Sequence, residues 1–390
     1  MKILYITPFF NYPPMDGASL RTVKLFEALY DEFDIDVITY KNNPLNNEVF
    51  HYFKKTNFYF FSSKFESPKP VSFLNRLISS TLPGFSSHNP KSIANDINRI
   101  LDKNGHYNIL YFATQLMGQA KLHLSSEIYS ILDLYDIYST YTKTKMKGVH
   151  YFRPYYWLFA IEAIRVRRFE KNILKNFNIL LTTCNENKYA VKDLCPESRI
   201  LKISNGTILP KNIKIGKGNS LLMVGNFEYS GNFEGIKWFL ENVWPSLKEK
   251  TDLMLLLVGK YSNSLKKLVV NDSQIQLTGM VPKLDSYYEN AGCVILPLFN
   301  DGGTKTKLIE AMAYGIPIVS THVGAKGFES IDTIYKTDNP RKFSKYILKI
   351  FANDIKYDSL ITNQKFVAKN LSWKKIGRKL KYSLKNLPIN

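Results

Sequence analysis

Short apolar runs, separated by loops that contain glycine and proline, alternate with longer runs of mixed character along the chain. The runs at 2–7 (KILYIT) and 35–40 (IDVITY) predict buried strands, because both are apolar, β-branched and shorter than a typical helix. The stretch from about Ser19 to Tyr30 lies between them and predicts a helix. Strand, loop, helix and strand in this order form a βαβ unit.

The same order of elements starts again near residue 220. The run 220–224 (SLLMV) predicts a strand, 232–242 predicts a helix, and 253–258 (LMLLLV) predicts a further strand. A second βαβ opening so far along the chain predicts a second sheet. The expected fold class is therefore α/β, with two doubly wound, Rossmann-like domains that face each other across a cleft.

The length of 390 residues also favours two domains over one. We expect a first domain at 1–205, a polar, glycine-bearing linker at 206–219, a second domain at 220–370, and a basic amphipathic helix at 371–390 that packs on the first domain. No stretch reaches the roughly 18–20 apolar residues that a membrane span needs. The first residues predict a core strand and not a signal peptide.

Charge and cysteine content narrow the possible partners. The net charge is +20, and the surplus is concentrated at 51–175, with 18 Lys and Arg against 8 Asp and Glu, and at 341–390, with 13 against 2. Nucleic acid, an anionic membrane or an anionic substrate would each suit it. The three cysteines show no metal-ligand spacing, and their odd number argues against a disulfide framework, which fits a reducing cytoplasm. Asp34 and Asp36 form a DxD, but they open an apolar strand, so we expect no metal site there.

Candidate chemistry is densest at 297–321 (PLFNDGGTKTKLIEAMAYGIPIVST). A glycine loop precedes a predicted helix at 305–314, which Gly315 and Pro317 end, and 316–320 predicts a buried strand. Free N–H groups at a helix N-terminus attract anions. Lysine side chains add positive charge there, and a glutamate one turn further can accept hydrogen bonds from a diol, so the pattern suits a nucleotide sugar. A plain turn before a helix is the alternative, since short motifs often occur by chance.

The run from Lys307 to Val319 (KLIEAMAYGIPIV) resembles the KxxEAMAxGxPVV signature of the retaining glycosyltransferases of family 4, also called group 1, which have the GT-B fold. Further stretches resemble other motifs of that family and of a sub-branch linked to surface polysaccharide synthesis: 178–185, 203–207, 223–232 and 278–281. The resemblance covers most of the chain and is densest from 178 to 328. It implies that the last helix crosses back to the first domain.

The resemblance also implies donor-binding positions: Gly17, Gly225, Asn226, Gly279, Val281, Asp301, Gly302, Gly303, Thr304, Lys305, Lys307 and Glu310. The Arg and Lys that many members place on the diphosphate in a GR…KG pattern are missing here, which passes that task to Lys305 and Lys307. Many members carry two glutamates eight positions apart. Glu310 matches the second, but Gly302 stands at the first, and the adjacent Asp301 is the candidate substitute.

In the first domain, Asp136 matches the acceptor-side segment of the family and is the third candidate catalytic residue beside Lys307 and Glu310. A polar loop with a helix cap is the alternative for it. The Asp16–Gly17 pair either brings backbone close to the reacting centre or forms a turn into a helix that Ser19 caps. Glu170 and Arg165 lie in a charged helix at 161–175, where we expect a solvated face with i,i+4 pairs.

The resemblance implies a metal-independent hexosyltransferase that retains anomeric configuration and needs no cofactor. Its partners would be a nucleotide-sugar donor and a saccharide or lipid-linked acceptor. The stretch 138–159 interleaves aromatic residues with Lys and Arg, which suits peripheral docking on the inner face of the cell membrane. No nucleic-acid motif is present. A catalytically silent GT-B-like partner is the alternative function, and a nicotinamide oxidoreductase is disfavoured because TPFFNYPPMDG lacks GxGxxG.

Overall fold

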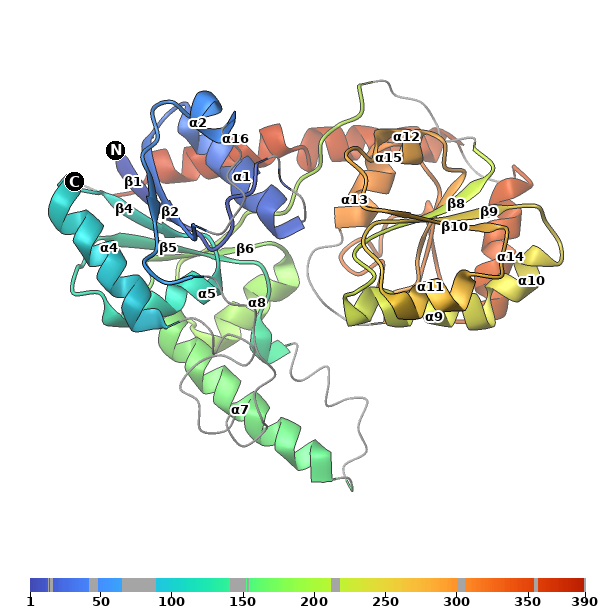
Figure 1. Ribbon diagram of the computed structural model, residues 1–390, viewed down its shortest axis with the longest axis horizontal. Helices are drawn as coiled ribbons and strands as arrows, with labels where there is room; N and C mark the ends of the chain where they lie inside the picture. Colours follow the sequence, from blue (N-terminus) through green and yellow to red (C-terminus); the bar gives the residue numbers. More distant parts are fainter. Residues whose placement is uncertain are drawn as a thin grey trace. The chain divides into compact units, whose positions relative to one another are not determined.

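The structure is a computed structural model that describes residues 1–12, 14, 17–41, 48–64, 89–140, 152, 154–211, 218–299, 306–353 and 357–388. Within these ranges the chain forms two compact units. Unit 1 contains Met1–Asn205 and Ile376–Asn390, and unit 2 contains Gly206–Asp301 and Lys305–Lys375. Each unit is one parallel sheet with helices on both faces (Figure 1).

The sheet of unit 1 has seven parallel strands in the order β3-β2-β1-β4-β5-β6-β7. Its strands are β1 (Lys2–Ile6), β2 (Asp34–Thr39), β3 (Phe58–Phe60), β4 (Ile109–Phe112), β5 (Tyr129–Leu134), β6 (Ile179–Thr182) and β7 (Ile200–Lys202). The helices are α1 (Gly17–Tyr30), α2 (Glu48–Tyr52), α4 (Pro90–Asn104), α5 (Gln115–Gly118), the 3-10 helix η1 (Gln119–His123), α7 (Pro154–Leu174) and α8 (Asn185–Leu194). The strand order reverses between β1 and β4.

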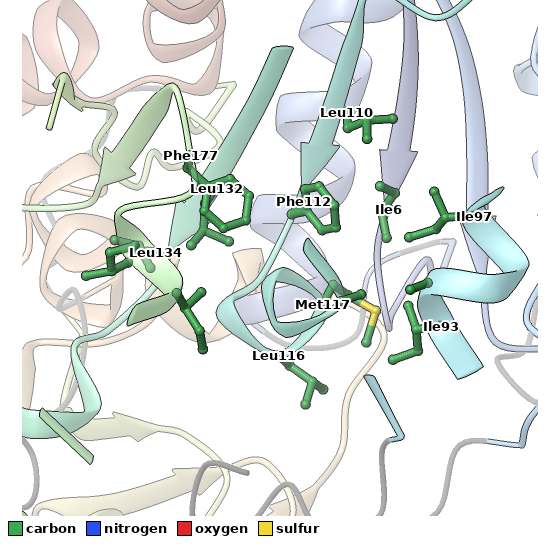
Figure 2. Close-up of a cluster of buried hydrophobic side chains, with 14 of the residues drawn as sticks. Ile6, Ile93, Ile97, Leu110, Phe112, Leu116, Met117, Leu132, Leu134 and Phe177 are labelled. Atoms are coloured by element: carbon green, nitrogen blue, oxygen red, sulfur yellow. The ribbon is translucent and has the colours of Figure 1, made fainter. Parts of the chain in front are cut away.

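One apolar core of unit 1 lies between the sheet and the helices α4, α5 and α7. Figure 2 shows its centre, where Phe112 and Leu132 from neighbouring strands meet Met117 and Ile93 from the helices. Each of these side chains is almost fully excluded from water. Because both faces of the sheet are covered, the strands are apolar along their whole length, which is the pattern of 2–7 in the sequence.

The sheet of unit 2 has six parallel strands in the order β10-β9-β8-β11-β12-β13. Its strands are β8 (Ser220–Val224), β9 (Met254–Val258), β10 (Ile275–Gly279), β11 (Cys293–Leu296), β12 (Ile318–Ser320) and β13 (Ile334–Lys336). The helices are α9 (Ser230–Asn242), α10 (Trp244–Lys248), α11 (Asn263–Val269), α12 (Asp285–Glu289), α13 (Thr306–Ala313), α14 (Pro340–Phe351) and α15 (Tyr357–Asn370). The order reverses between β8 and β11, so this is a second doubly wound sheet.

The strands and helices predicted from apolar periodicity are confirmed, with shifts of one or two residues at their ends, while the charged helix expected at 161–175 is α7 and begins earlier, at Pro154. The predicted strand 220–224 is β8 itself, and the predicted helix 305–314 is α13. The helix expected from Ser19 begins at Gly17 instead, so Ser19 lies inside α1 and is not its cap. Ser19 is buried there, which makes the cap interpretation wrong.

The basic helix predicted near the C-terminus is α16 (Trp373–Lys385), and from Ile376 onward it belongs to unit 1. It packs on α1: a Cβ at Gly377 would collide with the side chain of Ala28. Lys381 Nζ lies 3.5 Å from a carboxylate oxygen of Glu32, which also pairs with Lys385. The predicted return of the last helix to the first unit is therefore confirmed.

The expectation of a solvated face at Glu170 is wrong. The Glu170 side chain on α7 is fully buried, and its Oε1 accepts hydrogen bonds from the backbone N–H of Tyr138 at 2.7 Å and from Gln115 Nε2 at 3.1 Å. Its Oε2 accepts one from the N–H of Ser139 at 3.0 Å. A carboxylate can be buried when such donors replace water. Glu170 thus anchors the segment that follows β5.

Asp36 has a structural place in β2. Its side chain is fully buried, and Oδ1 accepts hydrogen bonds from the backbone N–H of Asn57 at 3.2 Å and from Asn57 Nδ2 at 2.8 Å. Tyr107 donates its hydroxyl proton to the other carboxylate oxygen.

In the described part of the chain, no helix is both long and apolar enough to cross a bilayer.

Candidate functional site

The switch point of unit 2 lies between β8 and β11, where the crossover connections leave towards opposite faces. In doubly wound sheets, ligands bind outside the carboxyl ends of the strands at such a point. Gly225 and Asn226 follow β8 directly, and α13 is the first helix after β11. Candidate residues 225, 226, 307 and 310 therefore belong to one edge of one sheet.

Helix α13 ends where the sequence predicts. Gly315 has φ +64°, in the left-handed region that favours glycine. Its N–H donates to the Met312 carbonyl at 3.1 Å, and the next N–H, from Ile316, donates to the Ala311 carbonyl at 3.1 Å. These bonds satisfy carbonyls that the helix end would otherwise leave open. The buried face of α13, which includes Leu308 and Met312, fixes the rotation of the helix.

Lys307 points from α13 to the end of β8. Its Nζ donates a hydrogen bond to Asn232 Oδ1 at 2.9 Å, and a Cβ at Gly225 would lie 2.5 Å from that Nζ. A side chain at position 225 would therefore displace the ammonium group from this place. Asn232 is buried on α9, and its Nδ2 donates to the Asn226 carbonyl at 2.7 Å. One amide therefore holds both the lysine and the loop after β8.

Glycines also let the backbone segments at the ends of the neighbouring strands pack directly against each other. Gly259, with φ +130°, follows β9 and lies against the Gly225 carbonyl, where any Cβ would collide. The Gly259 N–H donates to the Gly279 carbonyl at 2.9 Å, and Gly279 itself has φ +73°. Val281 packs against the apolar cluster beneath α13. Positions 225, 279 and 281 thus lie at the carboxyl ends of β8 and β10, with β9 between these two strands.

Glu310, one turn after Lys307, is partly buried. Its Oε2 accepts a hydrogen bond from the Tyr288 hydroxyl at 2.8 Å. Tyr288 on α12 is almost fully buried and stacks on Tyr314, with ring centroids 5.0 Å apart. The Tyr314 hydroxyl donates to Asp285 Oδ1 at 2.8 Å. Within the described ranges, no hydrogen bond to Oε1 of Glu310 is formed, so this oxygen can accept one from a ligand.

Burial raises the pKa of the Glu310 carboxyl, while the Tyr288 hydrogen bond and the charge of Lys307 oppose that rise. Burial, followed by the proximity of Glu310, raises the pKa of the Tyr288 hydroxyl well above its ordinary value. Tyr288 is therefore a neutral donor at physiological pH. A carboxylate whose burial is offset by a neutral donor and a nearby cation is typical of a functional site.

Unit 1 holds a different charged group near its own switch point. The Arg21 guanidinium from α1 donates to both carboxylate oxygens of Asp133 on β5, at 2.7 and 2.9 Å. The Tyr111 hydroxyl donates to the same carboxylate at 3.3 Å. The third Arg21 nitrogen donates to Asn205 Oδ1 at 2.8 Å and to the Ser204 carbonyl at 3.3 Å. This pair ties α1 and β5 to the end of unit 1.

Asp136, the candidate acceptor-side residue, lies two residues after β5 and is partly buried. The backbone just after it is fixed by the buried carboxylate of Glu170. Gly17 is the first residue of α1, where no side chain would meet a neighbour within 4 Å. Open space of this kind permits a ligand but does not require glycine.

The remaining candidates lie outside the described residues: Asp16, Asp301, Gly302, Gly303, Thr304 and Lys305. Most of the stretch 138–159 lies outside them as well. The structure also adds residues that the sequence did not single out, namely Asn232, Tyr288 and Arg21. Asn232 closes the quoted stretch 223–232, but nothing in the pattern pairs it with Lys307, and Tyr288 lies in an ordinary polar run.

Comparison with known proteins finds a family match within unit 2. Residues 218–353 match the family described as Glycosyl transferases group 1. A 195-residue alignment, covering 45% of this chain, is 28% identical to an uncharacterized 44.6 kDa protein in the cps region of Klebsiella pneumoniae. That alignment spans 47% of the Klebsiella protein, so less than half of this relative is matched.

Two solved structures share the fold over nearly the whole length. The sucrose-phosphate synthase tll1590 from Thermosynechococcus elongatus has a TM-score of 0.74 at 18% identity, over 99% of this chain and 98% of that chain. Anabaena Alr3699/HepE, solved in complex with UDP and glucose, has a TM-score of 0.65 at 12% identity, over 99% of this chain and 100% of that chain. With two parallel Rossmann-like sheets the chain has the GT-B fold, and residues 218–353 of its unit 2 match the group 1 glycosyl transferases.

Proposed function

We propose that this chain is a retaining hexosyltransferase that moves a sugar from a nucleotide diphosphate donor to a saccharide or lipid-linked acceptor in cell-surface polysaccharide synthesis. The observation that carries the proposal is the placement of Lys307 and Glu310 one helical turn apart on α13, at the switch point of unit 2. The family match, the UDP and glucose bound to Anabaena HepE, and the relative in a cps region support it.

The donor diphosphate would lie against Lys307. Its ammonium group is held at the end of β8 by Asn232, and its positive charge would attract the phosphate oxygens there. Negative charge grows on the diphosphate as the glycosidic bond breaks. A cation that is already in place stabilises this charge without reorganisation, an effect of roughly 3–4 kcal/mol for one removed donor in other enzymes. The N–H groups of 302–304, Lys305 and Asp301 are proposed to complete this pocket.

The donor ribose would lie against Glu310. Its Oε1 can accept a hydrogen bond from a ribose hydroxyl while Oε2 stays with Tyr288. Positive-φ Gly279 and the adjacent Val281 would offer backbone groups to the nucleobase, and Gly225 and Asn226 would border the sugar. Gly302 replaces the glutamate that reads the sugar in many relatives. We therefore expect this departure from the family pattern to change which donor sugar the chain accepts and to leave nucleotide binding intact.

In unit 1, Asp136 is proposed to meet the acceptor hydroxyl, and Gly17 to border the donor. The reaction would run without a metal, with the acceptor approaching the face that the diphosphate leaves, so that configuration is retained. The inner face of the cell membrane is the proposed place of work, since a lipid-linked acceptor would be presented there.

Thermal shift tests the donor pocket. Wild-type protein would be screened against UDP, GDP, ADP and CMP, because a ligand that binds the native state raises Tm by mass action. We expect one nucleotide to raise Tm, and Glu310→Ala and Lys307→Ala to abolish that rise. Glu249→Ala and Lys250→Ala are matched controls, because they remove the same charges from exposed positions of unit 2 and should keep the wild-type response.

Turnover separates an enzyme from a silent partner. Release of the nucleotide from its sugar conjugates would be measured for wild type and for Lys307→Ala, which should lose about 100- to 1,000-fold in kcat if the lysine stabilises the departing charge. Nucleotide binding without turnover of any conjugate would favour the silent GT-B-like protein. No response to any nucleotide would contradict the donor site.

A further inference from the structure

Helix α7 carries an exposed stripe that neither the sheet nor another described helix covers. Trp157, Ile161 and Ile164 are 61%, 51% and 55% exposed. Their spacing of four and three residues places them on one side of the helix. Single exposed apolar residues are ordinary, but three large ones in a row along one helix mark an interaction surface.

The same stripe continues as a row of cations. Arg168 and Lys171 follow Ile164 at the same helical spacing, Lys175 stands in the turn directly after the helix, and all three are exposed. The opposite side of α7 packs into unit 1 through Val166 and Ile173. The stripe therefore has an apolar half near the start of the helix and a basic half near its end.

Within α7 no carboxylate interrupts this surface. The two acidic residues of α7, Glu162 and Glu170, are both buried on other sides of the helix. Arg167, at the border of the stripe, pairs with Asp193 of α8 at 2.9 Å and holds the basic half against unit 1. Figure 1 shows that the N-terminal end of α7 extends away from the sheet of unit 1.

An anionic bilayer fits this surface better than a protein does. A single convex helix offers a line of contacts and no groove, whereas a stable protein interface needs roughly 800 Å² on each partner. Interfacial helices lie along the bilayer surface and bury an apolar face by about 5–10 Å, and three large apolar side chains on one side of a helix provide such a face. Tryptophan favours the headgroup level, and exposed Lys and Arg are attracted by anionic lipid.

We propose that the exposed stripe of α7 docks unit 1 on an anionic lipid bilayer, with Trp157, Ile161 and Ile164 at the acyl boundary and Arg168, Lys171 and Lys175 against the headgroups. The surface itself does not depend on the transferase reaction. It deepens the proposed function only by giving a lipid-linked acceptor a defined side of unit 1 from which to enter.

Vesicle flotation tests the surface. The full chain would be mixed at physiological salt with vesicles of phosphatidylcholine alone or of phosphatidylcholine with phosphatidylglycerol. Wild type should float with the mixed vesicles and not with phosphatidylcholine alone. Replacing the three cations by Gln should weaken partition about 100-fold, because each contributes a roughly equal electrostatic attraction. The triple change Trp157→Ser, Ile161→Asn, Ile164→Asn should abolish flotation at all salt concentrations.

A matched control has the same change of charge elsewhere. Arg341→Gln, Lys342→Gln and Lys345→Gln remove three exposed cations from α14 of unit 2, and they should leave most of the partition intact. If they weaken it as much as the α7 changes do, net charge and not this stripe binds lipid. Leu268→Asn with Val270→Asn is the corresponding control for exposed apolar residues.

Two further measurements complete the test: light scattering and the response of Tm to nucleotide. A wild type that ignores anionic vesicles, yet self-associates in light scattering until the apolar triple change is made, would overturn the proposal in favour of a protein contact. The response of Tm to nucleotide would be measured on every α7 variant. It should equal that of wild type, which shows that the fold and donor site are intact. If no nucleotide binds even to wild type, the proposed function fails while the flotation result still decides the surface.

Discussion

Folding buries the carboxylate of Asp133 in unit 1 fully and that of Glu310 in unit 2 in part, and the partners of the two differ. Asp133 receives a guanidinium through two hydrogen bonds and a tyrosine hydroxyl through a third. Glu310 receives one neutral hydroxyl and lies near an ammonium group whose Nζ is bonded to Asn232. Both Asp133 and Arg21 are 1% exposed, whereas Glu310 keeps contact with solvent.

The difference separates a structural ion pair from a binding site. A buried charge with a full set of partners becomes destabilising when one of those partners is removed. A buried charge with an open oxygen costs folding free energy in the absence of a ligand, and this cost is offset when a ligand donates to it. In both carboxyls burial raises the pKa, so the direction of the shift alone does not distinguish the two roles.

The largest effect is expected at Arg21. Arg21→Met should destabilise unit 1 by about 3–5 kcal/mol, because it leaves the Asp133 carboxylate buried and unpaired. Arg167→Met is the control, since its pair with Asp193 is exposed and should contribute at most about 1 kcal/mol. Urea unfolding followed by circular dichroism measures both. Equal losses in the two variants would mean that the Arg21 pair is no more structural than a surface pair.

At neutral pH, Glu310→Gln should make the nucleotide-free chain more stable and lower its affinity for the nucleotide. Burial raises the pKa of Glu310, so the folded chain holds this proton more tightly than the unfolded chain. Stability is therefore lost as the pH rises from the ordinary value of 4.5 through the raised folded value, and the variant, which has no charge to bury, escapes that loss.

At neutral pH we expect a higher Tm for nucleotide-free Glu310→Gln than for wild type, and the gap should close as the pH falls towards the ordinary value. Affinity for the nucleotide should fall about 10- to 100-fold, because a hydrogen bond to a charged group contributes roughly 1.5–3 kcal/mol. Calorimetric titration at two pH values measures this. A variant that is less stable yet binds nucleotide normally would place Glu310 with Asp133 as a structural carboxylate.

Asn232→Ala tests how Lys307 is held. Without the amide, the ammonium group loses its 2.9 Å acceptor and the Asn226 carbonyl loses its 2.7 Å donor. We expect kcat/KM to fall about tenfold, mainly in kcat, since a misplaced cation costs stabilisation of the transition state. Asn232→Asp restores the acceptor for Lys307 and should recover part of kcat. Equal losses in both variants would show that the loop after β8 matters and the position of Lys307 does not.

The smallest effect is expected for Tyr288→Phe. Its hydroxyl lowers the pKa that burial raises in Glu310, so its removal should raise that pKa further. Nucleotide binding needs the carboxylate, and on acidification it should therefore be lost at a higher pH than in wild type. Stability should change by only about 1 kcal/mol. Titrations between about pH 5 and 8 would reveal the shift, and an unchanged pH profile would mean that Tyr288 contributes packing alone.

The strands, the helix ends and the repeated βαβ order were predictable because each is a local property of the chain. Apolar periodicity indicates which side of a strand or helix is buried. The glycine at 315 indicates a residue with left-handed backbone conformation at the helix end. The placement of candidate residues after strands followed from the same reasoning. The expectation for Glu170 failed because its donors, the N–H groups of Tyr138 and Ser139, lie about thirty residues earlier in the chain.

By itself, the sequence determined two doubly wound sheets, a basic last helix and the position of Lys307 and Glu310 on one helix. The tertiary structure alone decided which partners these charges have. Arg21 and Asp133 are 112 positions apart, Lys307 and Asn232 are 75 apart, and Tyr288 and Glu310 are 22 apart. Such pairs form only when the order of the strands brings loops that are distant in the sequence to the same edge of a sheet. A local pattern of polar and apolar residues contains no information about that order.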